Sequence, residues 1–242
     1  MQNDFDNAGL IDLDSKAPVT AEEMKMIEDL GERMGISKLI MMENAGSRIA
    51  HFIFQNLSSF GSNRGHEKTK VLFIAGTGNN GGDTFVAARH LVYWKDDFDV
   101  SLAIIGKAEE IRAKEAKANF EILEGISNIR LVQIDSEGLI ESLARLLEMS
   151  KIIVVGIFGT GFRGEPRPLQ GKIIDLINEK SGAMKISVDV PSGLEAESGN
   201  FKLAVRSDYT IAMHAPKVGM EKTQAAKELC GRILVANIGV PL

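Results

Sequence analysis

The chain lacks the features that would place it outside the cell or in a membrane. It has a single cysteine, Cys230, so no disulfide can form within it and a reducing compartment is expected. No apolar run approaches the roughly 20 residues that a membrane-spanning helix needs. Residues 1–6 are polar and acidic, without the basic and apolar regions of a secretory signal. We therefore expect a cytoplasmic protein without membrane attachment.

An excess of positive charge is also absent. The 28 lysines and arginines face 33 aspartates and glutamates, so nothing is left over to neutralise a phosphate backbone, and no nucleic-acid partner is expected. The four histidines lie far apart without ligand spacing, which argues against a transition-metal site. What is present is ordinary for a globular protein: 44% hydrophobic and 25% charged residues.

Short, continuous apolar runs recur along the chain after residue 70. They predict strands over 71–75, 100–105, 129–134, 152–158, 186–190, 209–213 and 233–238. Helical windows lie between most of them, over 85–94, 108–123, 138–149, 169–179 and 216–229. Strands that are apolar on both faces and alternate with helices indicate a mostly parallel sheet covered on both sides. We therefore predict an α/β protein, a three-layer α/β/α sandwich.

Two further helices are predicted before the first of these strands. Thr20 and Glu23 form a capping box that begins the first helix, and Gly35 can end it. Ser37 can cap the second helix, which runs to about residue 57. Residues 1–17 are polar and aperiodic, so we expect an N-terminal arm there and a single domain over 18–242.

The first candidate site sequence, residues 76–83, directly follows a predicted strand. Its glycines allow a phosphate to approach the backbone, and Asn79, Asn80 and Asp83 add oxygen-bearing side chains. The next predicted strand does not end in a carboxylate, which disfavours an ordinary NAD dehydrogenase. The alternative interpretation is a Gly/Asn turn that only caps the following helix.

Two more sequences follow strands in the same way. Residues 158–167 hold three glycines with Arg163 and Arg167, which suit an anionic group; the alternative is a glycine-rich connection with solvated charges. Asp189 ends a strand just before Pro191 and Ser192, where a carboxylate can transfer protons; the alternative is that it caps its own turn. The carboxyl ends of parallel strands share one edge of a sheet, so all three sequences are expected to line one crevice.

Taken together, the motifs resemble the YjeF N-terminal domain family, the NAD(P)H-hydrate epimerases. The resemblance extends from about residue 19 to residue 219. It is carried in order by VTAEEM (19–24), MENAG (42–46), GNNGGD (78–83), ARHL (88–91), FGTG (158–161), DVPSG (189–193) and APKVG (215–219). It implies a Rossmann-like sandwich, commonly dimeric, and a substrate that is NADH or NADPH hydrated at the nicotinamide ring (NADHX or NADPHX). The implied reaction interconverts the R and S epimers at C6.

The resemblance also implies residue roles. Asp189 would contact the reactive ring, and Asn80 and Ser192 would hold a potassium ion. The substrate-binding residues carried over are Asn79, Asn80, Gly81, Gly82, Asp83, Gly159, Thr160, Gly161, Phe162, Arg163, Gly164, Glu165 and Asp189. No kinase-like dehydratase domain follows in the sequence, so a separate dehydratase is expected to act on the S epimer.

The chemistry of the substrate agrees with a catalytic role for Asp189. C6 beside a ring nitrogen is a hemiaminal carbon, so loss and return of its hydroxyl, or ring opening, would scramble its configuration. Either route asks for one well-placed acid/base, and Asp189 is the candidate.

Two positions depart from the family pattern. Gly156 stands where relatives usually carry an aspartate that ligates potassium, so we expect a weakened cation site. Thr84 stands where they usually carry glycine, and a β-branched residue is poor at positive φ, so a different turn is expected. The alternatives to the epimerase are a non-catalytic nucleotide-binding or dimerising scaffold module of the same fold, and a nucleotide-binding enzyme with another substrate.

Overall fold

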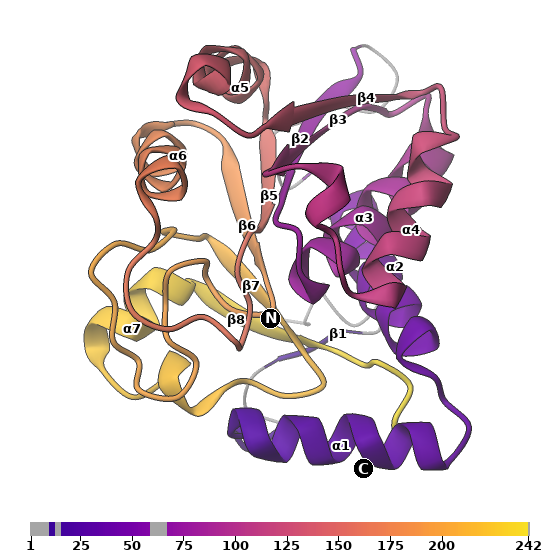
Figure 1. Ribbon diagram of the computed structural model, residues 1–242, viewed down its shortest axis with the longest axis vertical. Coiled ribbons are helices and arrows are strands. Elements are labelled where there is room, and N and C mark those ends of the chain that lie inside the picture. Colours follow the sequence, from indigo (N-terminus) through magenta and orange to yellow (C-terminus); the bar gives the residue numbers. More distant parts are fainter. Residues whose placement is uncertain (1–9, 13–15, 59–66, 242) are drawn as a thin grey trace.

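The computed structural model describes residues 10–12, 16–58 and 67–241. They form one eight-stranded sheet in the order β1-β8-β7-β6-β5-β2-β3-β4 (Figure 1). The strands are β1 (Leu10–Asp12), β2 (Thr69–Ala75), β3 (Phe98–Ile105), β4 (Ile129–Ile134), β5 (Ile152–Gly156), β6 (Met184–Val188), β7 (Tyr209–Met213) and β8 (Arg232–Ala236). Strands β2 to β8 are parallel, so the predicted α/β architecture is confirmed.

Helices cover both faces of this sheet. In Figure 1, α2, α3 and α4 lie on one face and α5, α6 and α7 on the other, while α1 lies apart from both layers. Short 3-10 helices lie between these elements: η3 (Val92–Trp94), η4 (Ala108–Glu110), η5 (Glu137–Leu139) and η6 (Val218–Met220). The α-helices are α1 (Ala21–Arg33), α2 (Lys38–Gln55), α3 (Asn79–Leu91), α4 (Lys114–Glu124), α5 (Ile140–Met149), α6 (Pro168–Glu179) and α7 (Gln224–Cys230). Among the described residues, no helix has the length and apolar character to cross a membrane.

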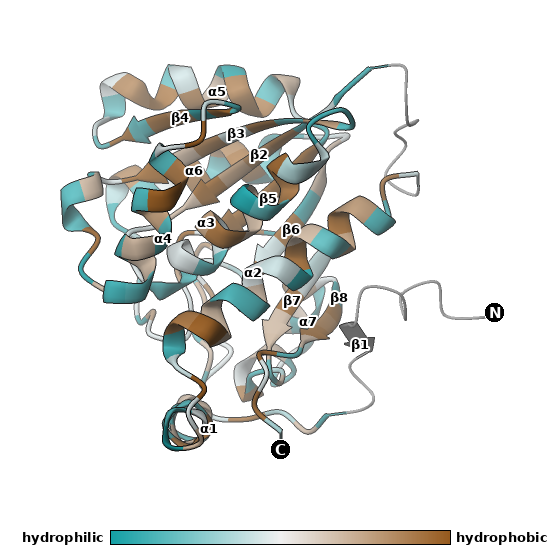
Figure 2. Ribbon diagram, turned by 90° about the vertical axis from the view of Figure 1, so that its right-hand side faces the viewer, coloured by the Kyte–Doolittle hydropathy of each residue, from teal (hydrophilic) through white to brown (hydrophobic). Residues whose placement is uncertain are grey.

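The alternation of side chains along each strand explains why both faces are apolar. In β2, Val71 and Phe73 pack in the core under α2 and α3, whereas Leu72 and Ile74 pack in the core under α5 and α6. All four are at most 1% exposed. Figure 2 shows the strands at the centre of the sheet coloured mainly as hydrophobic. Continuous apolar runs in the sequence are therefore the signature of this doubly covered sheet.

The direction in which the sheet grows reverses at β2. Strands β3 and β4 are added on one side of β2, and β5 to β8 on the other. The connections that leave β2 and β5 therefore run to opposite sides. In open α/β sheets, ligands bind in the crevice that this opens beyond the carboxyl ends of the two strands.

The capping signals of the first two helices are confirmed. Thr20 and Glu23 form the capping box of α1, and the Ser37 side chain accepts the Ile40 N–H at the start of α2. After α1 ends, Gly35 adopts φ +90°, a conformation that favours glycine.

The N-terminal arm contains a strand that the sequence did not indicate. Residues 10–12 form β1, which pairs antiparallel with β8 and lies at the edge of the sheet. Three residues are too few to show strand periodicity, so only the partner strand reveals this element. Residues 1–9 and 13–15 of the predicted arm lie outside the described part of the chain.

Several predicted boundaries were wrong. Helix α3 begins at Asn79, six positions before the predicted window, because Gly78 serves as its N-cap. The strands predicted over 152–158 and 186–190 end at Gly156 and Val188. Two helical windows are interrupted: the one over 108–123 is α-helical only from Lys114, and the one over 216–229 only from Gln224.

Candidate active site

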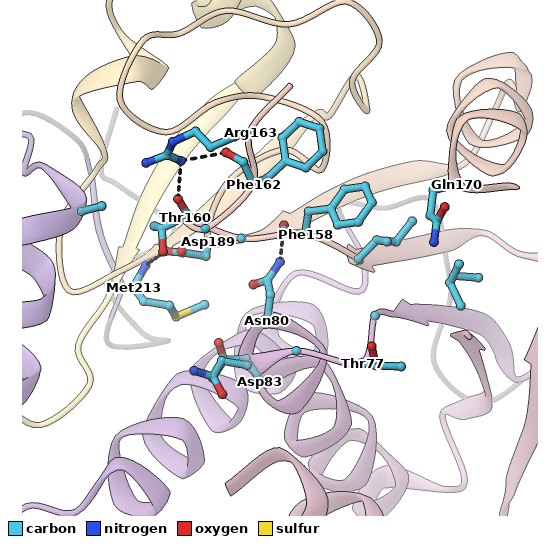
Figure 3. A pocket seen from close by; sticks show the side chains of 18 of the residues that line it. Thr77, Asn80, Asp83, Phe158, Thr160, Phe162, Arg163, Gln170, Asp189 and Met213 are labelled. Carbon is cyan, nitrogen blue, oxygen red and sulfur yellow. Dashed lines mark hydrogen bonds between the residues drawn. The ribbon is translucent and has the colours of Figure 1, made fainter. Parts of the chain in front are cut away.

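A cavity of about 790 Å³ lies beyond the carboxyl ends of the strands. It is bordered by the segments after β2, β3, β5, β6 and β7, with α1 forming an additional wall. Asn80, Thr160 and Asp189 all line it, so the three strand-end sequences meet at one cavity as expected (Figure 3).

The floor of the cavity between β2 and β5 is backbone. Gly76 donates its N–H to the Gly156 carbonyl at 3.0 Å. A Cβ on Gly76 would fall well under 3.0 Å from the Ile157 carbonyl oxygen, and one on Gly81 would fall equally close to the Gly76 carbonyl oxygen. Glycine is therefore required here by close packing of main chain against main chain.

The segment predicted as a loop over 76–83 is a loop only as far as Gly78. Residues Asn79 to Asp83 form the first turn of α3, so side chains rather than a glycine loop face the cavity. Asn79, Asn80 and Asp83 line the cavity, whereas the buried Gly81 and Gly82 are not among its lining residues.

Asn80 connects α3 to the loop after β5. Its side-chain Nδ2 donates to the Phe158 carbonyl at 2.7 Å (Figure 3). Its Oδ1 is buried and has no hydrogen-bond partner among the described residues. A buried acceptor without a partner is costly, so Asn80 presents an oxygen that a bound molecule can satisfy.

The loop after β5 supplies the opposite wall. Phe158 and Phe162 stack with ring centroids 4.8 Å apart, and Arg163 Nη1 donates to the carbonyls of Thr160 and Phe162. Of the predicted residues in this loop, all but Gly164 line the cavity. Gly164 instead donates its N–H to Glu195 at 2.8 Å.

Asp189 is held in an uncommon backbone conformation. Its φ is +64°, and the Val190 N–H donates to the Val188 carbonyl at 2.8 Å, which makes a tight turn around Asp189. A non-glycine residue at positive φ carries strain that surrounding contacts must offset, and such residues cluster at functional sites. The turn ends β6 and directs the carboxylate to the cavity.

The carboxylate of Asp189 has two partners. Its Oδ1 accepts the Met213 N–H at 3.1 Å and forms an ion pair with the Lys217 ammonium. Lys217 is fully buried, and its Nζ also donates to the carbonyls of Met213 and Ala215 at 2.9 and 3.1 Å. The alternative in which Asp189 caps its own turn is not what the structure shows, because its partners come from β7 and the segment after it.

The sequence indicated Lys217 through the APKVG motif, with a place at the pocket and a supporting structural role both left open, but it did not place helix α1. The structure places Lys217 at the cavity as the partner of Asp189, which lies 28 residues earlier in the chain. From α1, Met24, Lys25 and Glu28 line the cavity. The capping box predicted helix α1, but it did not indicate which side of this helix faces the cavity.

Acidic groups are concentrated at this cavity. Burial raises the pKa of Asp83 well above its usual value, and the charges of Asp189 and Glu28 raise it further. Burial also raises the pKa of Glu28, although Lys38 opposes this shift. Asp83 and Asp189 thus have different environments: Asp189 has a buried cation as partner, while Asp83 is favoured in its protonated form.

The side chains that the resemblance assigns to potassium are partly committed to other hydrogen bonds. The Ser192 hydroxyl already accepts the N–H groups of Ile157 and Phe158 at 3.1 and 3.0 Å and lies 3.3 Å from the Phe158 carbonyl. Gly156 offers no carboxylate. Of the three positions, only Asn80 has an oxygen without a partner.

The helical position of Thr84 corrects one expectation. Thr84 lies inside α3 and is not among the residues with positive φ, so the β-branched side chain does not alter a turn. Its hydroxyl donates to the Asn80 carbonyl, one turn earlier, at 2.8 Å.

Comparison with known families gives this site a context. The family model described as YjeF-related protein N-terminus matches residues 38–219, which include the site sequences after β2, β5, β6 and β7. The chain belongs to the YjeF N-terminal family.

Relatives within this family come in two sizes. Proteins named NAD(P)H-hydrate epimerase from Cenarchaeum symbiosum and Nitrosopumilus maritimus are 36% and 33% identical, and each match covers 92% of this chain and 95% of the relative. The bifunctional NAD(P)H-hydrate repair enzyme Nnr of Archaeoglobus fulgidus is 34% identical, but the chain spans only 42% of its length.

A solved structure shows the same fold. The crystal structure of a yeast protein superposes with a TM-score of 0.74 at 21% sequence identity, covering 92% of this chain and 87% of that chain. At this identity the likeness concerns the fold alone.

Proposed function

We propose that this protein is an isomerase that interconverts the R and S forms of NADH and NADPH hydrated at C6 of the nicotinamide ring. The observation that carries the proposal is the convergence of Asn80, Thr160 and Asp189, from three separate strand ends, on one cavity. The relatives named NAD(P)H-hydrate epimerase, matched over nearly their whole length, support the same reaction.

The reaction needs proton transfer at one carbon. C6 bears a hydroxyl beside the ring nitrogen. When a proton reaches that hydroxyl, water leaves and the nitrogen lone pair forms a C=N bond; water then adds to either face and gives up a proton. In the ring-opening route the C6 hydroxyl gives up its proton and becomes a carbonyl, while the N1–C6 bond breaks and the nitrogen takes up a proton; the reverse steps close the ring on either face of the carbonyl. Both routes ask for a group that takes a proton and a group that supplies one.

Asp189 and Asp83 can divide these tasks. The Asp189 side chain is held at the cavity by the ion pair with Lys217 and the hydrogen bond from Met213, and it is the proposed proton acceptor. The raised pKa of Asp83 suits a proton donor. Two carboxyl groups in different environments at one site are a common arrangement for acid/base chemistry. Both side chains border the same space in Figure 3.

The cavity also suits the rest of a dinucleotide. Lys25, Arg163 and Arg167 line it and supply positive charge for a pyrophosphate. The unpaired Oδ1 of Asn80 can accept an N–H or O–H of the hydrated ring. Of the remaining residues carried over from the family, those that line the cavity are proposed to shape its walls.

The direct test is proton NMR of a mixture of the two hydrate epimers. Adding the protein should accelerate exchange between the epimers, and Asp189→Asn should remove the acceleration while binding persists. Absence of exchange with the unaltered protein would contradict the proposal. Titration with NADH and NADPH then shows whether the cavity binds a nicotinamide nucleotide at all, as the alternative of a nucleotide-binding scaffold module requires.

Partners and location follow as parts of the same proposal. We propose that a separate dehydratase consumes the S epimer, supported by the match to relatives named as epimerases alone. A homodimer is supported by Met34, Leu39 and Ile40, which are 53%, 44% and 47% exposed where α1 meets α2. The single cysteine, buried and free, supports a cytoplasmic location. Sedimentation of Ile40→Lys against the unaltered protein tests the dimer.

A further inference from the structure

The cavity extends well past the acidic groups proposed for the reaction. In Figure 3, Asp83 and Asp189 lie to the left and Thr77 and Gln170 to the right, with Asn80 between them. We call the end of the cavity that Thr77 and Gln170 line the distal end. A volume of about 790 Å³ is ample for more than one ring, so the distal end has room for the part of a dinucleotide that does not react.

A carboxylate reaches the distal end from the chain after β3. Gly106 directly follows the strand with φ +121°, and the chain then enters η4, which ends at Glu110. A Cβ on Gly106 would lie 2.9 Å from Glu110 Oε2 and 3.2 Å from Thr77 Cγ2, so both side chains lie against this glycine. The Lys107 N–H donates to Glu110 Oε2 at 3.3 Å. The Glu110 carboxylate therefore stands beside Thr77 and lines the cavity.

The position of Glu110 in the sheet gives its carboxylate a chemical meaning. Strand β3 follows β2 and α3 in the chain and pairs parallel with β2. In dinucleotide-binding sheets, an acidic residue after the second strand of such a unit accepts hydrogen bonds from the ribose hydroxyls, whereas a 2′-phosphate calls for an arginine. Strand β3 itself ends without a carboxylate, as the sequence indicated, but η4 supplies one from Glu110.

The α6 wall of the distal end offers a carboxamide. Gln170 lies in the first turn of α6, and its Oε1 is buried without a hydrogen-bond partner among the described residues. Ile105 and Ile157, which are 3% and 5% exposed, line the same cavity. Aliphatic side chains beside a carboxamide suit adenine, because its amino group can donate to the amide oxygen. A ligand that satisfies this oxygen removes the cost of burying it unpaired.

We propose that the distal end binds the adenosine of the nucleotide, with Gln170 at the adenine and Glu110 at the ribose hydroxyls, so that the protein prefers hydrated NADH to hydrated NADPH. The identity of the nucleotide rests on the proposed function. A 2′-hydroxyl can donate to the Glu110 carboxylate, whereas a 2′-phosphate would place two negative groups side by side. Lys107 does not offset this repulsion, because it stands 4.0 Å from Asp135 and is not among the cavity-lining residues.

Calorimetric titration with NADH and NADPH at low ionic strength tests the preference without any turnover. NADH should bind at least about tenfold more tightly than NADPH. Glu110→Gln should bring the two affinities within about threefold of each other, mainly by improving NADPH binding. Glu109→Gln is the matched control, since Glu109 is an exposed neighbouring carboxylate that does not line the cavity, and it should keep the full difference.

Three results of these titrations would overturn the proposal. One is equal binding of the two nucleotides, or binding of neither, by the unaltered protein. Another is the same difference in affinity in Glu110→Gln as in Glu109→Gln. The third is tighter binding of NADPH, which would assign the 2′-phosphate to Arg167, the basic residue that precedes α6 and lines the cavity.

The adenine contact is tested with ADP-ribose, which carries the adenosine end but no nicotinamide. ADP-ribose should displace NADH from the unaltered protein. Gln170→Leu should weaken the binding of ADP-ribose and of NADH by the same factor, about 3–10-fold, because one hydrogen bond is lost from each. Failure of ADP-ribose to displace NADH, or unchanged affinity in the variant, would overturn the assignment of the distal end to adenosine.

Epimer exchange keeps this proposal separate from the proposed function. The ratio of kcat/KM for hydrated NADH over hydrated NADPH should follow the ratio of the two binding affinities. Equal kcat/KM for the two hydrates would overturn the preference and leave the proposed function standing. If neither hydrate is exchanged although NADH binds more tightly than NADPH, the proposed function fails and the assignment of the distal end stands.

Discussion

Two adjacent strands of this sheet end in the same strained turn. Asp189 follows β6 and His214 follows β7, and both adopt φ +64°. In each turn the next residue donates its N–H back to the residue before the turn at 2.8 Å, and the turn residue donates to the neighbouring strand. The backbone geometry is shared, so the difference between the two positions lies in their side chains and surroundings.

The surroundings of the two turns differ sharply. Asp189 lines the cavity, accepts the Met213 N–H and is paired with Lys217. His214 is 4% exposed, and its Nδ1 is buried without a hydrogen-bond partner among the described residues. Burial and the charges of Lys16 and Lys217 lower the pKa of His214 to about 4. One turn therefore presents a charge to a ligand, while the other holds a neutral ring in the interior.

The comparison separates backbone strain from function. A strained turn at the carboxyl end of a strand does not by itself identify a reactive residue, because His214 has the turn without the cavity. The contacts of the side chain distinguish the two positions. The predictions below test that distinction, beginning with the largest expected effect.

Asp189→Asn should reduce the rate of epimerisation by about 10²–10⁴-fold, because the amide cannot take a proton from the substrate. The fold should remain intact at lower stability: Asn tolerates positive φ and can still accept the Met213 N–H, but the buried Lys217 ammonium loses its carboxylate partner. NMR exchange rates and circular dichroism measure the two effects. Full activity in this variant would remove Asp189 from the mechanism.

Lys217→Met should lower the free energy of unfolding by about 3–5 kcal/mol, because it leaves the Asp189 carboxylate without its buried cation. Urea unfolding of the variant measures the loss. Combining it with Asp189→Asn should recover part of the stability, since no buried charge then remains unpaired. Strictly additive losses would show that the two residues are not coupled.

Asp83→Asn should slow epimerisation by about 10²-fold if Asp83 supplies a proton. The same variant should be more stable than the unaltered protein, by a margin that grows as pH rises. The reason is that a carboxyl whose pKa is raised in the folded state loses its stabilising contribution as pH increases. Urea unfolding at pH 6 and pH 8 checks the trend, and a margin that shrinks with pH would contradict it.

His214→Asn should leave epimerisation nearly unchanged and alter only the response to acid. With a folded pKa of about 4 against 6.5 in the unfolded chain, His214 favours unfolding as pH falls from 6.5 toward 4. Between pH 7.5 and pH 5, the free energy of unfolding of the unaltered protein should fall by about 1–2 kcal/mol more than that of the variant. Identical pH dependence in both proteins would mean that His214 is not the responsible group.

The sequence predicted the sheet well because its signals are local. A strand buried on both faces needs a continuous apolar run, and runs such as residues 71–75 and 209–213 fall on β2 and β7. The meeting of Asn80, Thr160 and Asp189 was also predictable, since parallel strands bring their carboxyl ends to one edge.

The remaining features depend on contacts between distant segments. The ion pair of Lys217 with Asp189 joins residues from separate strands, and no spacing rule predicts it. The packing of Thr84 against Gly156 is of the same kind: a Cβ on Gly156 would meet the Thr84 hydroxyl, yet each position looked like an isolated departure until the packing of α3 on β5 was known. The start of α3 at Asn79 was missed because its glycines resembled a loop, although Gly81 is needed for close packing.

The main-chain floor at Gly76 limits how this pocket can be redesigned. Peptide groups are chemically the same at every position, so substitutions cannot change the polar groups that this floor offers to a ligand. A methyl group on Gly76 would also push β2 away from the chain after β5. A change in which nucleotide is accepted is expected to come from side chains in the walls, such as Lys25 on α1 or the loop around Arg163. Variant libraries aimed at new substrates should therefore change the side chains of the cavity walls and leave the main-chain floor at Gly76 unaltered.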